Sequence, residues 1–439
     1  MDPAGGRTRS SLVLRPDPPD IRVRRDGCEN RSTARTAPGG LGSLTVRCYP
    51  WFGSDADFRA RCPVQSTVEP RNDDLAAEPE YGLWERSGAL GRPGTSVSTE
   101  RVAVIGLGQF GLEHLRSYLE LGHEICCAVD ISEPRTQMIA DAYAVPTGRD
   151  GVAAINSTRP TLVSIVTGPL QHRSLVEAAL AVGARVLVEK PFSATVADAQ
   201  VIAGLPEARD AVTPGHILRF DSAHRFVADQ VSSGTIGSII AIDSERHREH
   251  GHARRYADHS LSSLTLYHDL DLGLWLDNAR PVSVTAQATP SGPERSATYL
   301  SVTVGTDADT LWTLRCSWQL PDNADNRDRL QVFGTKGVIE LTVTGEAATV
   351  TITTAPGNPV TSMHGFATTA ALRNEIAAFA GGSASSVVSV DDAIACVRLV
   401  QAVDDAVRLG ETVRVEDGFH GSEPEATNPD GPDAAGRLS

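Results

Sequence analysis

The sequence predicts an α/β fold in two parts: a doubly wound parallel sheet, followed by an α+β region with a large, open, mostly antiparallel sheet. First, short apolar, β-branched runs alternate with helix patterns from Thr99 to about His216. Second, alternating segments without helices between them run from about residue 282 to residue 353. Third, a GxGxxG sequence at residues 106–111 separates a strand pattern from a helix pattern.

The first part is expected to contain five strands, because it has five buried apolar runs that are too short for helices. These runs are residues 102–105, 125–129, 162–166, 185–188 and 212–215. The first helix pattern has one apolar face, made of Leu112, Leu115, Tyr118 and Leu119. The later helices are expected at about residues 133–143, 170–182 and 196–205.

The second part is expected to begin with a helix, a strand and, after a polar stretch rich in His and Arg, a second helix. These elements are predicted at residues 223–232, 236–242 and 266–276. The half-exposed sheet is predicted from the alternating segments 282–288, 297–304, 310–319, 329–333, 338–343 and 349–353. Two final helices are expected at about residues 366–379 and 391–409.

These patterns divide the chain into four segments. Residues 1–98 are rich in Pro, Gly, Ser, Asp and Arg and lack apolar periodicity, which predicts a disordered extension. The alternative is a folded mini-domain around Tyr49, Trp51, Phe52 and Trp84. The parallel sheet is assigned to residues 99–216, the α+β domain to 217–415, and a disordered tail to 416–439.

The composition of the 439 residues excludes several classes of protein. A net charge of −15 argues against nucleic acid as a main partner, because binding to phosphates needs a basic surface. No apolar run approaches the ~18 residues that suggest a membrane span. Seven cysteines without CxxC pairs are typical of a reduced protein, so we expect a cytoplasmic location.

The GxGxxG sequence has the context of a dinucleotide-binding turn. Gly106 allows the tight turn, Gly108 lets a pyrophosphate approach, and Gly111 lets the next helix pack closely. Gln109 and Phe110 open that helix, whose unpaired N–H groups favour phosphate. The alternative is a glycine-rich turn without function. The strand before the turn, the helix after it and an acidic residue further on favour dinucleotide binding.

Asp130 ends the second strand, nineteen positions after the last glycine of the motif. Its carboxylate can accept hydrogen bonds from a ribose diol and would repel a 2′-phosphate, so NAD is favoured over NADP. Arg135 lies a few residues further on and keeps NADP possible. We therefore expect residues 99–216 to be an NAD(P)-binding domain of the Rossmann type.

Of the 40 lysines and arginines, two are lysines: Lys190 and Lys336. Unlike arginine, a lysine can shift its pKa and relay a proton. Lys190 follows Glu189 at the end of a predicted strand, where ligands bind to open parallel sheets; the alternative is a surface ion pair between the two. Lys336 is typical of a hairpin turn. The preceding strand ends at the same edge, where the chain has Thr167, Gly168, Pro169 and, five residues after Thr167, His172.

His268 opens the helix predicted at residues 266–276. An imidazole can exchange a proton near neutral pH, which the interconversion of an alcohol and a ketone requires. The alternative is a helix N-terminal histidine that is capped by Asp269 or Asp271.

A second group of histidines lies in the polar stretch at residues 246–255. The spacings of its histidines suit no common zinc template, so we expect no metal there; they are His247, His250 and His252. An arginine-rich loop near the active cleft is the better interpretation, because guanidinium groups bind hydroxyls, carboxylates and phosphates of a substrate.

Together these residues resemble the glucose–fructose oxidoreductase/inositol dehydrogenase/rhizopine-catabolism family, Gfo/Idh/MocA, over about residues 99–415. The resemblance is carried by residues 106–111, Asp130, 167–172, 189–191, 215–220 and 268–276. It implies a Rossmann domain followed by an α+β domain whose open sheet often forms the dimer contact. A homodimer or homotetramer is therefore expected.

The resemblance also implies roles for individual residues. Lys190 would hydrogen-bond the reacting oxygen, and His268 would be the general acid/base for that oxygen. Besides the glycine turn and Asp130, the expected cofactor contacts are Thr167, Gly168, Pro169, His172, Glu189 and Lys190. The expected substrate contacts are His216, Arg219, Tyr256, Tyr267 and His268.

Two positions depart from the family pattern. Gly168-Pro169 stands where the family commonly has Pro-Asn after the threonine. Leu264 stands four residues before His268, where many members have an aspartate that orients the imidazole. Loss of an orienting carboxylate is costly in other histidine systems. Here Asp269, Asp271 or a backbone carbonyl would have to take its place; the alternative is that His268 is a less active base.

The sequence therefore predicts an NAD(P)-dependent oxidoreductase that transfers a hydride between nicotinamide and a small-molecule polyol, cyclitol or sugar, including nucleotide-linked sugars. One alternative is a non-catalytic regulator that binds dinucleotide or sugar; Leu264 favours it and the Lys190/His268 pair disfavours it. The other alternative is an NAD-dependent glycosidase, which would release sugar without net NADH.

Overall fold

The computed structural model describes residues 99–256, 259–289, 298–354, 360–367 and 370–415. The predicted extension at residues 1–98, its mini-domain alternative and the predicted tail at 416–439 lie outside these residues. Within the described ranges, none of the helices combines the length and the hydropathy that a membrane span needs.

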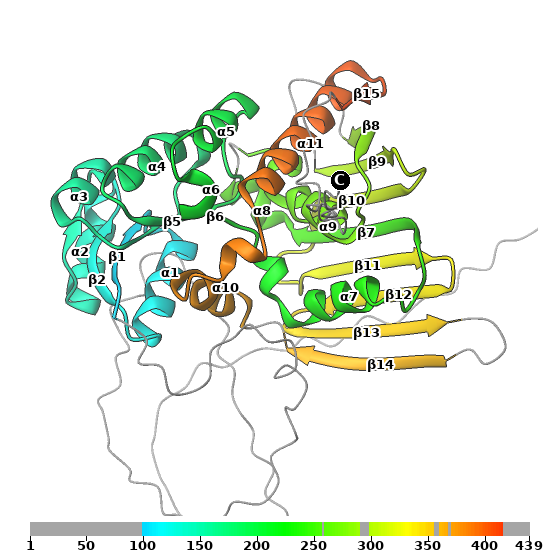
Figure 1. Cartoon of the computed structure of the whole chain (residues 1–439), viewed down its shortest axis with the longest axis horizontal. Coiled ribbons are helices and arrows are strands. Elements are labelled where there is room, and N and C mark those ends of the chain that lie inside the picture. The colour runs from blue at the N-terminus through cyan, green and yellow to red at the C-terminus, as the bar shows by residue number, and fades with distance from the viewer. Residues whose placement is uncertain (1–98, 257–258, 290–297, 355–359, 368–369, 416–439) are drawn as a thin grey trace, which may run out of the picture. The chain divides into compact units, whose positions relative to one another are not determined.

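The first sheet has six parallel strands in the order β3-β2-β1-β4-β5-β6, which is the doubly wound order (Figure 1). Its strands are β1 (Arg101–Ile105), β2 (Glu124–Val129), β3 (Thr147–Gly148), β4 (Leu162–Ile165), β5 (Arg185–Glu189) and β6 (Val212–Gly215). Its helices are α1 (Gln109–Glu120), α2 (Glu133–Tyr143), α3 (Gly151–Thr158), α4 (His172–Ala181), α5 (Val196–Ala203) and α6 (Ala208–Ala211). The predicted parallel sheet is confirmed. Three elements were not predicted, because they are too short to carry a clear apolar pattern: β3, α3 and α6.

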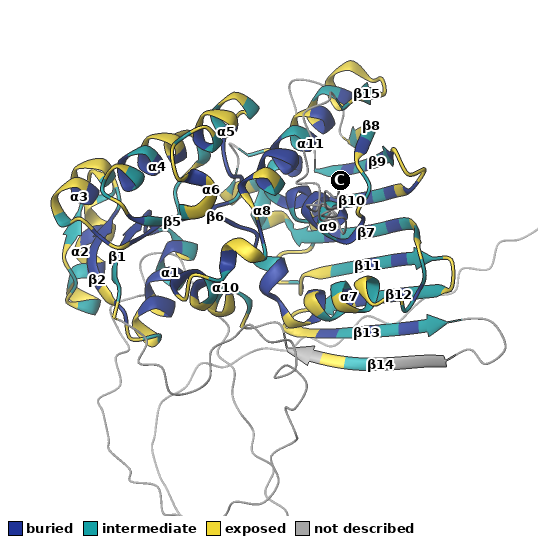
Figure 2. Cartoon of the chain, viewed as in Figure 1, coloured by how far each residue is buried: buried dark blue, intermediate teal, exposed yellow. Residues whose placement is uncertain are grey.

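In β1, β4 and β5, the central strands of this sheet, alternate residues belong to two separate cores. In β1, Val102 and Val104 lie in one core, and Ala103 and Ile105 lie in the other. Residues of α1, α2 and α10 (Ala371–Ala380) complete the first core, and residues of α3, α4, α5 and α11 (Val390–Leu409) complete the second. The central strands are therefore buried on both faces, and β1 is mostly dark blue in Figure 2. This is why they form continuous apolar runs in the sequence.

The second sheet has nine strands in the order β14-β13-β12-β11-β7-β10-β9-β8-β15 (Figure 1). β7 and β10 pair in parallel, and the other neighbours are antiparallel. The strands are β7 (Ile239–Glu249), β8 (Pro281–Thr289), β9 (Tyr299–Thr306), β10 (Leu311–Leu320), β11 (Arg327–Gly334), β12 (Gly337–Thr344), β13 (Ala347–Thr354), β14 (Val360–Ala367) and β15 (Val413–Arg414). The predicted open, mostly antiparallel sheet is confirmed.

Helices cover one face of this sheet and share a core with it. In β10, Trp312, Leu314 and Cys316 are buried against these helices, and the residues between them are more exposed. The helices of this part are α7 (Ser222–Ser232), α8 (His250–Arg255) and α9 (Tyr267–Leu276). A π-helical turn, Ser262–Leu266, leads directly into α9.

Two of the expected boundaries are wrong. β7 continues to Glu249, so Arg246 and Arg248 lie on a strand and not in a loop. The polar residues of this strand concealed its alternation. Phe366 lies in β14, and the helix expected from that residue begins at Ala371. A strand that pairs with β13 extends the sheet where a helix was predicted.

The last two helices return to the first sheet. Arg185 of β5 donates hydrogen bonds to the carbonyls of Phe379 (2.6 Å) and Ala380 (2.9 Å) at the end of α10. Its guanidinium also lies 5.6 Å from the centre of the Phe379 ring. The chain after β14 thus contributes to both cores of the parallel sheet, while the domain boundary at residue 216 stays a prediction.

Candidate active site

The glycine turn has the geometry that phosphate binding requires. Gly106 has φ +96°, and a Cβ on it would lie 2.3 Å from the carbonyl oxygen of Val166. A Cβ on Gly111 would lie 1.9 Å from the carbonyl oxygen of Gly106. A Cβ on Gly108 would meet nothing within 4 Å. The chain therefore packs tightly behind the turn and is open in front of it.

The N-terminus of α1 faces this opening. No side chain caps it, and its first turn, which contains the exposed Gln109 and the half-buried Phe110, has no acidic residue. Its unpaired N–H groups and the positive end of the helix dipole are thus left for an anion. The residues present fit a dinucleotide pyrophosphate, and they would hold it through the backbone of the turn.

Asp130 is held against the same turn. Its Oδ2 accepts a hydrogen bond from the backbone N–H of Leu107 (2.8 Å), and its Oδ1 accepts one from that of Ser132 (2.8 Å). Arg135 lies 3.5 Å from Oδ2. The carboxylate thus has a fixed position next to the glycine turn, which suits a contact with ribose hydroxyls.

The segment after β4 presents Thr167, Gly168 and Pro169, none of which is fully buried. His172 differs from them: its ring is fully buried, with its nitrogens 3.1 Å from the carbonyl oxygens of Thr167 and Phe192. The expectation that its side chain contacts the cofactor is therefore corrected. His172 fixes the segments after β4 and β5 relative to each other.

Lys190 follows β5, and its peptide bond with Pro191 is cis. Its Nζ donates a hydrogen bond of 2.7 Å to the carbonyl oxygen of Leu264, in the π-helical turn before α9. Burial, together with the charges of Arg246 and Arg248, lowers the pKa of Lys190 to about 8, and the charge of Glu189 opposes the shift. The surface ion pair considered from the sequence is therefore not what the structure shows.

His268 lies in the first turn of α9, close enough to Lys190 for the two charges to interact. Burial lowers the pKa of His268 well below its usual value, and the positive charges of Lys190 and Arg246 lower it further. The imidazole is therefore neutral near pH 7 and able to accept a proton. Its ring nitrogens have no hydrogen-bond partner among the described residues.

Neither aspartate of α9 orients His268, which corrects the expectation from the sequence. Asp269 accepts hydrogen bonds from Ser244 (2.6 Å) and from Arg246 (3.1 Å). Asp271 accepts hydrogen bonds from Arg219 (2.6 Å). Both carboxylates are buried, and they anchor the helix rather than the imidazole.

Three residues that were expected to contact the substrate are buried around Asp271 instead. His216 lies 2.7 Å from Asp271 through Nδ1 and 3.1 Å from the Tyr267 hydroxyl through Nε2. His216, Arg219 and Tyr267 are each exposed by 3% or less, so their side chains cannot reach a substrate. Tyr256, just after α8, is half-buried and stays a candidate contact.

The two arginines of this stretch that lie on β7 have other partners. Arg246 and Arg248 both donate to Asp328, at 2.6 Å and 2.5 Å, so neither guanidinium is free to hold a substrate as predicted.

The group of possible metal ligands that converges within the described ranges does not include the histidines of this stretch. It consists of His216, Asp271 and Cys396. Arg219 already occupies the carboxylate of that group, which disfavours a cation there.

One residue near the site was not recognised in the sequence. His114 of α1 is fully buried, with Nε2 3.2 Å from Glu189 Oε1 and Nδ1 2.8 Å from Ser164 Oγ. It follows Gly111 by three residues, so it shares the inward face of the helix. A histidine in this apolar face was the signal that could have found it.

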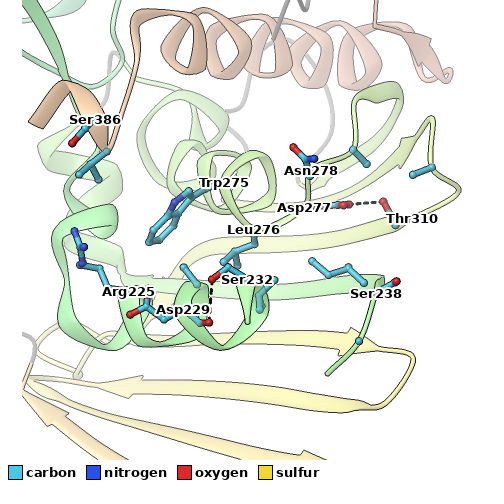
Figure 3. A pocket seen from close by; sticks show the side chains of 17 residues that line it. Arg225, Asp229, Ser232, Ser238, Trp275, Leu276, Asp277, Asn278, Thr310 and Ser386 are labelled. Atoms are coloured by element: carbon cyan, nitrogen blue, oxygen red, sulfur yellow. Dashed lines mark hydrogen bonds between the residues drawn. The ribbon is translucent and has the colours of Figure 1, made fainter. Parts of the chain in front are cut away.

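A cavity of about 760 Å³ lies apart from these residues (Figure 3). It is lined by α7, the end of α9 and the start of β7, with Arg225, Trp275 and Ser386 among its side chains. None of the residues predicted for the active site lines it. The candidate active site is therefore distinct from this cavity.

The fold and the glycine turn define a dinucleotide-binding protein, and comparison with known families agrees. A family model described as an oxidoreductase family with an NAD-binding Rossmann fold matches residues 100–216. The model of the GFO/IDH/MocA C-terminal domain matches residues 224–340. Together they match more than half of the chain, which belongs to the GFO/IDH/MocA family. The predicted nicotinamide dinucleotide is thereby confirmed, and the preference for NAD over NADP stays a prediction.

Individual relatives are dehydrogenases. The chain is 30% identical over 197 residues to inositol 2-dehydrogenase from Pseudomonas fluorescens, a match of 42% of this chain and 56% of that protein. It thus spans little more than half the length of that curated relative. The fold is similar to scyllo-inositol dehydrogenase from Lactobacillus casei (TM-score 0.61, 19% identity, 73% of this chain and 99% of that one). It is also similar to UDP-N-acetylglucosamine 3-dehydrogenase from Acidithiobacillus ferrooxidans (TM-score 0.61, 22% identity, 71% and 98%).

The three glycines allow a test that separates folding from binding. In Gly111→Ala the new methyl group would collide with backbone, so the free energy of unfolding should fall by roughly 1–3 kcal/mol. In Gly108→Ala the methyl group has room, so stability should stay within about 0.5 kcal/mol. The affinity for NADH should nevertheless fall by about tenfold or more, because the methyl group occupies the approach of the phosphates. Denaturant unfolding measures the stability of each variant, and NADH fluorescence titration measures its affinity for the dinucleotide. An unchanged affinity in Gly108→Ala would contradict the assignment of the glycine turn as the phosphate site.

The role of Asp130 predicts a change in cofactor preference. Asp130→Asn keeps the shape and the hydrogen-bond acceptor but removes the charge that repels a 2′-phosphate, so the affinity for NADPH should rise by about tenfold. Asp141→Asn in α2 is the matched control, since its carboxylate is exposed and bonds to Gln137. The measurement is the ratio of the Kd values for NADH and NADPH. An equal change of that ratio in both variants would count against Asp130 as the discriminating residue.

Proposed function

We propose that the chain is an NAD-dependent dehydrogenase that oxidises a secondary alcohol of a polyol, cyclitol or sugar, or reduces the matching ketone. The observation that carries this proposal is the hydrogen bond of 2.7 Å from Lys190 Nζ to the Leu264 carbonyl. It holds the amine from the edge of the parallel sheet against the segment that leads to His268, four residues further along the chain.

The two side chains have complementary roles. His268, neutral near pH 7, accepts the hydroxyl proton during oxidation and returns it during reduction. An ammonium has three donors, and Lys190 spends one of them on Leu264. The others are left to stabilise the negative charge that develops on the substrate oxygen. When bound, the dinucleotide supplies the hydride acceptor or donor. Thr167, Gly168, Pro169, Asp130 and the glycine turn would hold it.

The substrate class is supported by the names of the relatives, which are dehydrogenases of inositols and of a nucleotide-linked sugar. The match to the first of these relatives spans 56% of its length. A homodimer or homotetramer in the cytoplasm is also proposed. The cytoplasmic location is supported by buried, free cysteines, among them Cys126, Cys127, Cys316 and Cys396.

A second candidate is a regulator that binds dinucleotide and sugar without turnover. It is favoured by one observation, namely that no carboxylate of α9 orients His268. A screen of cyclitols, sugars and their keto forms with NAD and NADP separates the candidates. A dehydrogenase accumulates or consumes reduced nicotinamide with at least one compound. A regulator binds the dinucleotide and leaves every compound unchanged. A glycosidase, tested with glycosides in place of free sugars, releases sugar without net formation of reduced nicotinamide.

Substitution of the two side chains tests their roles directly. Lys190→Met and His268→Ala should each lower kcat by about 10²-fold or more, because each removes a group that acts on the transferred proton or its oxygen. The Kd for NADH should change little. Lys336→Met is the matched lysine control, because this residue is exposed at a hairpin turn. Turnover near the wild-type rate in both site variants would reject the assignments.

The depressed pKa values predict the pH dependence of alcohol oxidation. Because Lys190 acts as an ammonium, kcat/KM should fall as the pH rises through about 8. Because the pKa of His268 lies well below its usual value, no loss is expected as the pH falls to about 6. Lys190→Arg should remove the alkaline fall, since arginine does not titrate in this range. A profile that still falls at pH 8 in this variant would show that another group titrates.

A further inference from the structure

His114 has a fixed place behind the site, and none of the roles proposed above uses it. Its ring is fully buried, with Ser164 Oγ 2.8 Å from Nδ1 and Glu189 Oε1 3.2 Å from Nε2. A buried imidazole with both nitrogens in hydrogen bonds has a defined orientation. It therefore presents one nitrogen steadily to the carboxylate that precedes Lys190.

Glu189 links this histidine to the lysine. Its Oε2 accepts a hydrogen bond of 3.2 Å from the backbone N–H of Lys190. On the other side, a Cβ at Gly215 of β6 would lie 2.9 Å from Oε1, so the adjacent strand leaves the carboxylate little room. The Glu189 carboxylate thus lies between His114 and the backbone of Lys190 and contacts both.

A second carboxyl group approaches Glu189 from α10. Glu375 is fully buried, and among the described residues neither of its side-chain oxygens has a hydrogen-bond partner. Burial raises the pKa of Glu375 well above its usual value, and repulsion by Glu189 raises it further. Two neighbouring carboxyls in a dry site do not both ionise. Glu189, which has two hydrogen-bond partners, is the one better able to hold the charge.

We propose that His114 is a positioning residue: by donating a hydrogen bond to Glu189, it makes Glu189 the ionised member of this buried carboxyl pair, and that charge keeps the Lys190 amine protonated. The inference rests on the role proposed above for Lys190. His114 acts through Glu189, and it touches neither the substrate oxygen nor the groups that exchange its proton.

The charges around Lys190 make Glu189 decisive. The groups that face the amine are Glu189 from β5, Arg246 and Arg248 from β7, His252 from α8 and His268 from α9. The groups that face Glu189, besides Lys190, are His114, Tyr118, His172 and Glu375. Among the described groups that act on the amine, Glu189 is the carboxylate that favours its charged form, and both arginines oppose it. Without this charge Lys190 would lose its proton at lower pH.

The chain has two lysines, so the titration of Lys190 can be measured without turnover. Trace acetylation of the full-length protein with acetic anhydride over a pH series, quantified by mass spectrometry, gives a curve for each amine. The exposed Lys336 is the internal reference. In the wild type, Lys190 should titrate near pH 8. In His114→Leu and in Glu189→Gln its midpoint should fall by about one unit, with the Lys336 curve unchanged.

Glu375→Gln is the matched control. Because Glu375 is already uncharged in this account, its isosteric replacement should leave the Lys190 curve unchanged. Ser164→Ala removes the contact to His114 Nδ1 and should lower the midpoint of the Lys190 curve by a smaller amount. This variant serves as the test if His114→Leu does not fold. Either of two results would overturn the proposal: an unshifted Lys190 in the His114 or Ser164 variant, or a shift in Glu375→Gln as large as in Glu189→Gln.

The labelling needs neither cofactor nor substrate, so its result is independent of the proposed function. If the function were wrong, no polyol would reduce the dinucleotide, and the curves of Lys190 could still follow the expected order. If the inference were wrong, turnover would be seen while His114→Leu left the curve of Lys190 in place.

Discussion

One hydrogen bond, from Lys190 Nζ to the carbonyl oxygen of Leu264, joins the binding edge of the parallel sheet to the segment that leads to α9. A π-helical turn provides this carbonyl. Such turns are rare in proteins, and those that occur often lie at functional sites. Lys190 directly follows a strand of the first sheet, and His268 lies in a helix that packs on the second. The two side chains are therefore close only because the parallel sheet and the α+β region meet at this point. The hydrogen bond from Lys190 to Leu264 is a contact between these two parts of the chain.

Buried ion pairs fix the helix that carries His268. Asp269 is paired with Arg246 of β7, and Asp271 with Arg219 after β6. Removing one partner of such a buried pair typically costs about 3–5 kcal/mol, because the other charge is left unpaired in a dry site. The position of His268 thus comes from an anchored helix. This explains how the imidazole can be placed although no carboxylate contacts it.

The parts of the site that the sequence predicted are those in which residue type alone restricts the chemistry. Gly106, Gly108 and Gly111 could be assigned because a tight turn, an open approach and close packing each need a residue without a side chain. Lys190 stood out because lysine is rare in this chain and this one follows a buried strand. The two sheets could be predicted because their burial patterns differ, one continuous and one alternating.

The parts that the sequence did not reveal depend on which way a polar residue faces. His216, Arg219 and Tyr267 were expected to contact substrate, yet they satisfy one another and Asp271 inside the protein. His172 was placed against the cofactor, yet its ring joins two segments of backbone. A polar side chain near a site serves equally well as ligand contact or as buried support. Only the partners supplied by distant segments decide between these, and sequence spacing does not give them.

The proposed chemistry requires Lys190 and His268 to act on one substrate oxygen. The most direct measurement is a crystal structure of the protein with NADH and an unreactive polyol bound. Lys190 Nζ and a ring nitrogen of His268 should both lie within hydrogen-bond distance, about 2.6–3.2 Å, of the hydroxyl on the carbon that faces the nicotinamide. A polyol that contacts only one of the two, or that lies in the cavity beside Trp275, would contradict it.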